Sequence, residues 1–133
     1  MATRGLTLER LPERYAVVRL EPQDDIPPWA RSTTFACVTR TREELSIVCG
    51  EAEVPAGVTA QRGFCGLQVK GPLDFSETGI LASLAGPLAK AGISIFAVST
   101  YDTDYLFVPA AQEPEAVQVL IGAGHTVHPA PEA

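Results

Sequence analysis

Two short stretches in the second half of this 133-residue chain carry residue types that could together hold a charged small molecule. Gly79-Ile80 stands at the expected start of a helix, where backbone N–H groups and the helix dipole favour a carboxylate. Asp104 stands in a turn between two expected strands, where its carboxylate could pair with an ammonium or guanidinium group. A free amino acid carries both kinds of charge and would fit such a pair.

Each of these residues also has a purely structural explanation. Gly79 would permit close packing of a helix on a strand, and Glu77 would complete a capping box as readily as it would accept an α-ammonium group. Aspartate is favoured at hairpin ends, which would account for Asp104, and the neighbouring Asp102 fits the turn better than it fits a site. Tyr101 is either a pocket wall or a surface aromatic. The residue types alone leave these alternatives open.

The elements that must position these residues follow a β-α-β-β-α-β order. The expected strands cover 64–71, 93–100, 104–110 and 125–128, and the expected helices cover 78–91 and 114–124. This order predicts an α+β, ferredoxin-like module: a four-stranded antiparallel sheet with both helices on one face. Both faces of the strand over 93–100 are apolar, so the sheet face away from the helices should be covered as well.

The helix over 78–91 is the best-defined of these elements. Its apolar residues recur every three or four positions, which is typical of a helix lying on a sheet. Asp74 or Ser76 is the expected N-cap, and Gly92 is the expected C′ residue. Pro87 inside the span should leave the carbonyl four residues earlier without its helical donor and kink the helix.

The first half of the chain repeats the same strand order with its helices eroded. Strands are expected over 15–20, 35–41 and 44–50, with at most one turn of helix around Trp29 after two prolines. The hairpin over 35–50 aligns with the second one at a constant offset of 60 residues, which places Glu44 over Asp104. We therefore expect two modules, residues 1–62 and 63–133.

Composition excludes several classes of function. The net charge of −6 and ten scattered basic residues argue against a nucleic-acid backbone as the partner. No apolar run approaches the roughly 20 residues of a membrane span, and the N-terminal segment lacks the apolar core of a signal peptide. Three cysteines without metal-type spacing predict a reduced, cytoplasmic protein in which they pack as small hydrophobes.

Catalysis has no visible support in the sequence. The two histidines, His125 and His128, stand three apart on an expected strand, so they should point to opposite faces and be solvated rather than share a metal. No phosphate loop, zinc spacing or nucleophile–histidine pair is present. We expect neither an enzyme nor a cofactor.

Residues 71–108 resemble an ACT domain, the small amino-acid-binding regulatory module. The features that carry the resemblance are the Gly79-Ile80 helix start, the helix end and strand over 91–95, and the turn from Ser99 to Asp104. Within that family the chain is similar to the tandem ACT group that includes the CASTOR arginine sensors, whose first repeat the run over 39–49 resembles. The likeness covers most of residues 15–128.

The resemblance implies a pair of ACT modules with the ligand at their interface. The residues that it assigns to the ligand's backbone groups are Glu77, Thr78, Gly79 and Ile80, and those assigned to its side chain are Ser99, Thr100, Tyr101 and Asp104, with Thr39 added from the weaker repeat. Asp104 would pair with the guanidinium of arginine or with another cationic amino acid. The eroded first repeat should lack an equivalent pocket. A homodimer and a protein partner for regulation are further expectations.

Two other functions share this strand order. A protein-interaction module would use the apolar sheet face and keep only a vestigial pocket. An RNA-binding ferredoxin-like domain would need a basic, aromatic sheet surface, which this sequence lacks.

Overall fold

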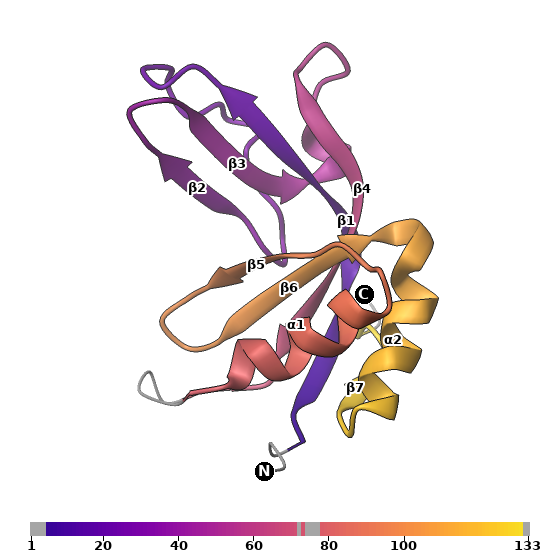
Figure 1. The fold of residues 1–133 in the computed structure, drawn as a ribbon. Helices are drawn as coiled ribbons and strands as arrows, with labels where there is room; N and C mark the ends of the chain where they lie inside the picture. The colour runs from indigo at the N-terminus through magenta and orange to yellow at the C-terminus, as the bar shows by residue number, and fades with distance from the viewer. Residues whose placement is uncertain (1–4, 72, 74–77, 132–133) are drawn as a thin grey trace. The chain divides into compact units, whose positions relative to one another are not determined.

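The computed structural model describes residues 5–71, 73 and 78–131 and divides the chain into two compact units. One unit is formed by residues 13–64, and the other by the residues before them and from Cys65 onward (Figure 1). The elements in chain order are β1 (Thr7–Leu20), β2 (Cys37–Arg40), β3 (Leu45–Gly50), η1 (Glu51–Glu53), β4 (Ala60–Val69), α1 (Ile80–Lys90), β5 (Phe96–Ser99), β6 (Asp104–Pro109), η2 (Ala110–Gln112), α2 (Glu113–Gly122) and β7 (Thr126–His128). The long strands β1 and β4 contribute residues to both units.

The unit of residues 13–64 contains four strands in the order β2-β3-β1-β4. The predicted hairpin is confirmed: β2 and β3 pair antiparallel, with Val38 opposite Ile47 and Arg40 opposite Leu45. Its core comprises Ala16, Val18, Leu45, Ile47, Cys49 and Val54. Trp29 packs against this core from a turn and not from a helix, which is within the expected limit of one helical turn. Only the short 3-10 helix η1 remains where the repeat would have helices.

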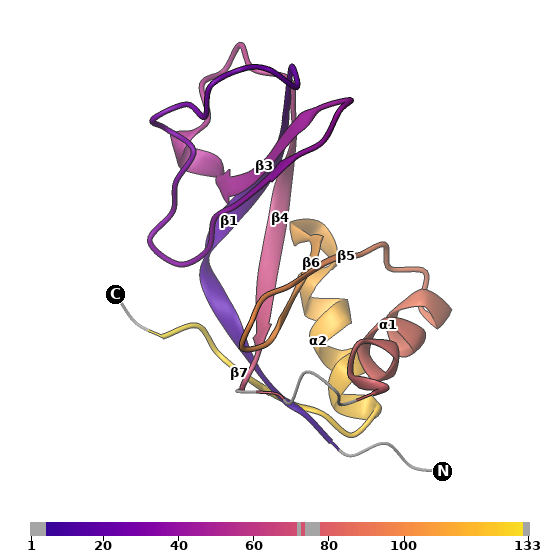
Figure 2. The ribbon, with the colours of Figure 1, turned by 90° about the vertical axis from the view of Figure 1, so that its left-hand side faces the viewer.

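The other unit has the predicted ferredoxin-like class, with α1 and α2 on the same face of its sheet (Figures 1 and 2). Its core consists of residues from both helices and the facing strands, among them Leu8, Leu67, Val69, Leu84, Leu88, Leu106, Val108 and Leu120. The strand order is β7-β1-β4-β6-β5. The final strand β7 therefore pairs with β1, and in parallel, rather than completing a four-stranded antiparallel sheet.

The reason for this difference is the first half of β1, where the sequence pattern predicts no strand. Leu6 and Leu8 are buried in the same core as the helices, so this segment takes the central place beside β4. Its charged residues obscured the strand pattern. In the folded chain they form ion pairs: Arg10 with Glu113 at 2.7 Å, and Glu9 with Lys70 at 3.5 Å.

Helix α1 begins two residues later and ends one residue earlier than expected, with Gly92 just beyond its end as expected. Its N-cap is Gly79, in the left-handed conformation with φ of 80°, and no side chain of the described residues caps it. Asp74 and Ser76, the expected caps, lie outside the described residues. Gly92 closes the other end, also at positive φ, and the Ile93 N–H donates to the Leu88 carbonyl in the pattern of a Schellman motif.

The sheet face away from the helices carries a pair of stacked aromatic rings. Phe96 on β5 and Phe107 on β6 have ring centroids 4.8 Å apart and planes inclined by 11°. Phe107 alternates with Leu106 and Val108, which belong to the helix-side core, and its side chain is fully buried. The expectation that this face is covered is confirmed at Phe107.

Candidate functional site

A cavity of about 320 Å³ lies where the start of α1 faces the turn between β5 and β6. Among the described residues its lining consists of Leu73, Gly79, Ile80, Leu81, Ala82, Ser99, Thr100, Tyr101, Asp102, Thr103 and Asp104. The helix start and the acidic turn therefore open onto one space. This volume is at the lower end of the range of small-molecule sites, about 300–1,000 Å³.

The helix side of the cavity offers backbone N–H groups. The amides of Ile80, Leu81 and Ala82 belong to the first turn of α1, where no helical carbonyl is available to accept their hydrogen bonds. The left-handed Gly79 lacks a side chain that could cover them, and a Cβ there would meet no atom of the described residues within 4 Å. An anionic group in the cavity could accept from these amides and would be favoured by the helix dipole.

The opposite wall is a turn that is fixed to the end of β4. The Thr100 N–H donates to the Thr103 carbonyl at 2.8 Å, and the buried Thr103 hydroxyl donates to the Val69 carbonyl at 2.7 Å. The Leu73 N–H donates to the Asp102 carbonyl at 2.8 Å. These bonds hold the wall of the cavity in one conformation.

Two carboxylates, Asp102 and Asp104, give this wall its charge. The Ser99 hydroxyl donates to Oδ1 of Asp104 at 2.6 Å, so one oxygen is held while the group stays partly exposed. Burial together with the Asp102 charge raises the pKa of Tyr105 beside the turn. The described lining includes no lysine, arginine or histidine. This wall therefore favours a cationic group.

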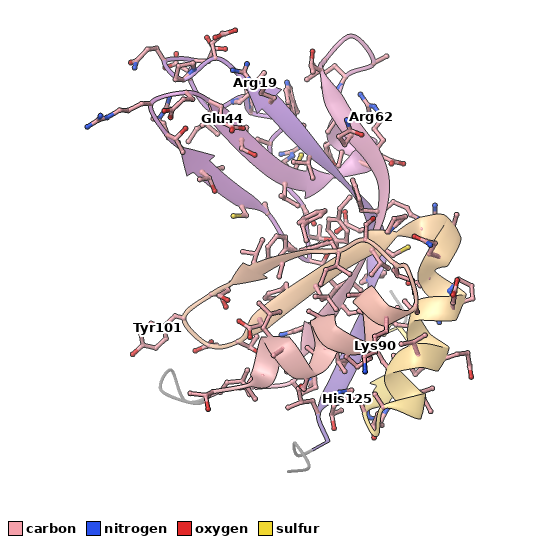
Figure 3. All side chains as sticks on the ribbon, viewed as in Figure 1. Arg19, Glu44, Arg62, Lys90, Tyr101 and His125 are labelled. Carbon is pink, nitrogen blue, oxygen red and sulfur yellow. The ribbon has the colours of Figure 1, made fainter. Side chains whose placement is uncertain are left out.

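Tyr101 stands at the rim of the cavity. Its side chain is 91% exposed and points outward from the end of the β5–β6 hairpin (Figure 3). Leu81 on α1 is also exposed and lines the same space. The rim is therefore apolar and the interior wall acidic.

Most of the site residues expected from the sequence lie around this cavity. Gly79, Ile80, Ser99, Thr100, Tyr101 and Asp104 line it. Thr78 precedes them on the exposed surface and is absent from the described lining, and Glu77 lies outside the described residues. Thr39 belongs to β2 in the unit of residues 13–64.

Some lining residues were missed by the sequence analysis. Leu81 and Ala82 follow directly from a helix that begins at Ile80, so their amides could have been included. Leu73 and the buried Thr103 gave no such signal, because their place depends on the backbone bonds between the turn and the end of β4.

The two hairpin turns match each other, but in a different register from the one expected. Thr41 and Thr100 each donate a backbone N–H at 2.8 Å to the carbonyl three residues later, and each hydroxyl contacts that same carbonyl. The true offset is therefore 59 residues, from Thr41 to Thr100, and the expected 60 is wrong by one.

The corrected register changes which residue corresponds to the acid. The last strand pair before the turn is Arg40 with Leu45 in the first hairpin and Ser99 with Asp104 in the second. The fully buried Leu45, and not Glu44, thus occupies the position of Asp104. Thr39 likewise corresponds to Val98 rather than to Ser99.

The unit of residues 13–64 has its own surface cavity, of about 470 Å³, lined by Glu13, Arg14, Glu51, Ala52 and Arg62. Both carboxylates are already engaged. Glu13 accepts hydrogen bonds from neighbouring hydroxyls, and Oε1 of Glu51 accepts from the Gly63 N–H at 2.5 Å. Arg62 donates to the Pro55 carbonyl at 2.9 Å. This cavity is a weaker candidate, because its carboxylates already serve local structure.

The other reactive residue types do not form a site in the described part of the chain. Cys65 and Cys49 are buried in the two cores, as expected of small hydrophobes, and Cys37 is half-buried. Burial, followed by the negative charge of Glu53, raises the pKa of the Cys49 thiol. No group of three or more metal-ligating side chains occurs among the described residues. Of the helices that the structure describes, none is long and apolar enough to cross a membrane.

Two protein-family descriptions match this chain, each over a different stretch. The ACT domain matches residues 59–121, and a family described as an N-terminal domain matches residues 13–57. The first match includes the start of α1 and the whole β5–β6 turn.

Comparison with known proteins found several relatives. A crystal structure of an Agobacterium tumefaciens protein is 36% identical, has a TM-score of 0.92 and is matched over 98% of this chain and 97% of its own. The human cytosolic arginine sensor for mTORC1 subunit 1 is 45% identical over 49 residues, which are 37% of this chain and 15% of that protein. The regulatory subunit of aspartate kinase from Thermus flavus shares the fold, with a TM-score of 0.58 at 14% identity over 92% and 99% of the two chains.

Proposed function

This chain belongs to the family of the Agobacterium tumefaciens protein, and on that premise we propose that it is a regulatory protein that binds a free amino acid. The ACT-domain match over residues 59–121 and the partial similarity to a cytosolic arginine sensor support this role. We assign it a sensing rather than a catalytic function.

The observation that carries the proposal is the pairing of helix amides and a carboxylate across one cavity. The amides at the start of α1 would donate hydrogen bonds to the ligand's α-carboxylate. Asp104 would accept its positive group, bidentately if that group is a guanidinium. An acidic wall with no basic residue among the described lining supports arginine or another cationic amino acid over an acidic one.

The proposal is tested by thermal shift and calorimetry with each of the twenty amino acids. We expect at least one cationic amino acid to raise the melting temperature and to release or absorb heat on titration. An absence of both signals for all twenty would reject the sensor role and favour the alternative, an interaction module with a vestigial pocket.

Asp104→Asn tests the acidic wall directly. Removing one member of a charge pair should weaken binding of the cationic amino acid by about 2–4 kcal/mol, because its positive group is left unpaired. The fold should be retained, since the change keeps the side-chain shape. Glu44→Gln is the matched control, because Glu44 lies in the other hairpin's turn and should leave affinity unchanged. Equal affinity in Asp104→Asn and the parent would remove Asp104 from the site.

The resemblance further leads us to propose that a second ACT module covers this cavity when the ligand is bound. The exposed apolar rim formed by Tyr101 and Leu81 supports such a contact. The simplest source is a second copy of the chain, so light scattering should report a dimer that the cationic amino acid strengthens. A dimer unaffected by any amino acid would instead support the interaction module.

A further inference from the structure

His125 connects three segments of the unit that contains the cavity. It lies just beyond α2, after the turn of Ala123 and Gly124 (Figure 3). His125 is 6% exposed. The Leu6 N–H donates to its Nδ1 at 3.0 Å, and its Nε2 lies 3.1 Å from the Ser83 carbonyl oxygen. A nitrogen that accepts from an N–H carries no proton, so the ring is neutral with its proton on Nε2. Nε2 therefore donates to Ser83. The expectation that His125 is solvated is wrong.

The carbonyl that His125 reaches is the one that Pro87 leaves without a donor. In an α-helix the Ser83 carbonyl would accept from the N–H of residue 87, but proline has none. The absent helical bond is thus replaced by a side chain from outside the helix. Without His125 this half-buried carbonyl would lose the donor that replaces the helical one, which is costly.

The repaired carbonyl belongs to the residue that follows the cavity-lining turn. The Ser83 N–H donates to the Gly79 carbonyl at 3.0 Å, and its hydroxyl donates to the Ile80 carbonyl at 2.8 Å. Ser83 therefore joins the first turn of α1, whose amides line the cavity, to the His125 ring.

His125 is itself held firmly by the backbone around it. Its N–H donates to the Leu120 carbonyl at 3.1 Å, and the Thr126 N–H donates to the Leu6 carbonyl at 2.8 Å. The N-terminal segment passes close by: a Cβ on Gly5 would lie 2.5 Å from the Gly124 carbonyl oxygen. These backbone contacts join the segment before β1 to the segment after α2, and they position the ring.

We propose that His125 is a positioning residue for the cavity, which supplies the hydrogen bond that Pro87 removes and so fixes the amide-bearing start of α1. The inference rests on the proposed function for its effect on ligand affinity.

A double-mutant cycle tests the proposal with the full chain. His125→Asn keeps an acceptor for the Leu6 N–H but is too short to reach Ser83, and Pro87→Ala restores the helical donor to the Ser83 carbonyl. We expect His125→Asn alone to raise the equilibrium constant of unfolding about tenfold, measured by urea denaturation, because a buried acceptor loses its donor. In the Pro87→Ala background, His125→Asn should raise the equilibrium constant of unfolding about twofold or less. His128→Asn, on the exposed strand residue nearby, is the matched control and should change nothing.

Two further measurements separate positioning from mere packing. Amide hydrogen exchange at Ser83 and Leu84 should accelerate in His125→Asn and return to the parent rate in the double variant. Calorimetry with L-arginine should show about tenfold weaker binding in His125→Asn and recovery in the double variant.

The outcomes distinguish this inference from the proposed function. The role of His125 is overturned if His125→Asn raises the equilibrium constant of unfolding equally in both backgrounds and Pro87→Ala does not restore the amide exchange rates. Restored stability and exchange support it whether or not arginine binds. If arginine binds the parent but with equal affinity to every variant, the coupling to the ligand is overturned. If arginine binds none of them, the sensor proposal loses support and the hydrogen-bond replacement is still decided by the first two measurements.

Discussion

The most densely bonded carboxylate among the described side chains belongs to Glu13, in the unit of residues 13–64. Its Oε1 accepts hydrogen bonds from the hydroxyls of Ser32 at 2.6 Å, Thr33 at 3.1 Å and Thr34 at 2.7 Å. Burial acts to raise the pKa of Glu13, but these hydroxyl donors together outweigh it and hold the pKa below the ordinary 4.5. The ionised carboxylate therefore stabilises the fold.

The pH dependence of this contribution follows from the sign of the shift. Because the pKa is lower in the folded state, the stabilisation is complete above about pH 4.5 and is lost as the pH falls through the folded-state pKa. Glu13→Gln should lower the free energy of unfolding at neutral pH by about 1 kcal/mol and flatten its fall in acid. Urea denaturation at pH values about one unit apart, from about pH 3 to pH 7, measures this dependence. Glu43→Gln, in an exposed turn, serves as the control, and a parallel acid response in parent and Glu13→Gln would contradict the assignment.

At the scale of elements, α1 begins at a glycine in the left-handed conformation. Gly79 has φ of 80°, a conformation that residues with a Cβ adopt only at a cost. No atom of the described part of the chain would meet a Cβ there within 4 Å, so the strain of a substitution comes from its backbone.

Gly79→Ala should therefore destabilise the chain by about 1 kcal/mol through backbone strain. Gly86→Ala is the matched control, since Gly86 is exposed inside the same helix at ordinary φ with open space around its Cα, and alanine there should stabilise by about 0.5–1 kcal/mol. Thermal melts of the two variants would move in opposite directions. A shift of both variants in the same direction would show that Gly79 is not held in its strained conformation in solution.

The sequence was sufficient to predict elements whose signals are local. The hairpins, both helices and the glycine that ends α1 follow from periodicity and turn residues, and the cavity follows from the order of the Gly79 helix start and the Asp104 turn. What the sequence could not supply is long-range. The place of β1 between β7 and β4 depends on Leu6 and Leu8 finding the helix-side core, and the role of His125 depends on a donor lost at Pro87.

At the scale of the whole chain, the residues before Glu13 belong with those from Cys65 onward. Leu6 and Leu8 contribute to the core beneath α1 and α2, and β7 pairs only with the start of β1 in the described sheet. A module that began at residue 63 would lack these two core residues and the strand with which β7 pairs.

A fragment of residues 63–133 should accordingly fail to fold stably, as judged by the absence of a cooperative melt in circular dichroism. Leu8→Ala in the full chain is the graded counterpart and should cost about 2–5 kcal/mol, because it opens a cavity in the core. A fragment that melts cooperatively would favour the simple division into residues 1–62 and 63–133 instead.

The matching turns of the two hairpins bear on how many molecules one chain can take up. The position held by Asp104 in one hairpin is held by the buried Leu45 in the other, so a carboxylate stands at only one of the two equivalent places. Two similar hairpins would suggest a stoichiometry of two. Under the proposed function, the side chains instead argue for saturation at a single equivalent of amino acid per chain, without the sigmoidal binding curve that two sites within one polypeptide would allow.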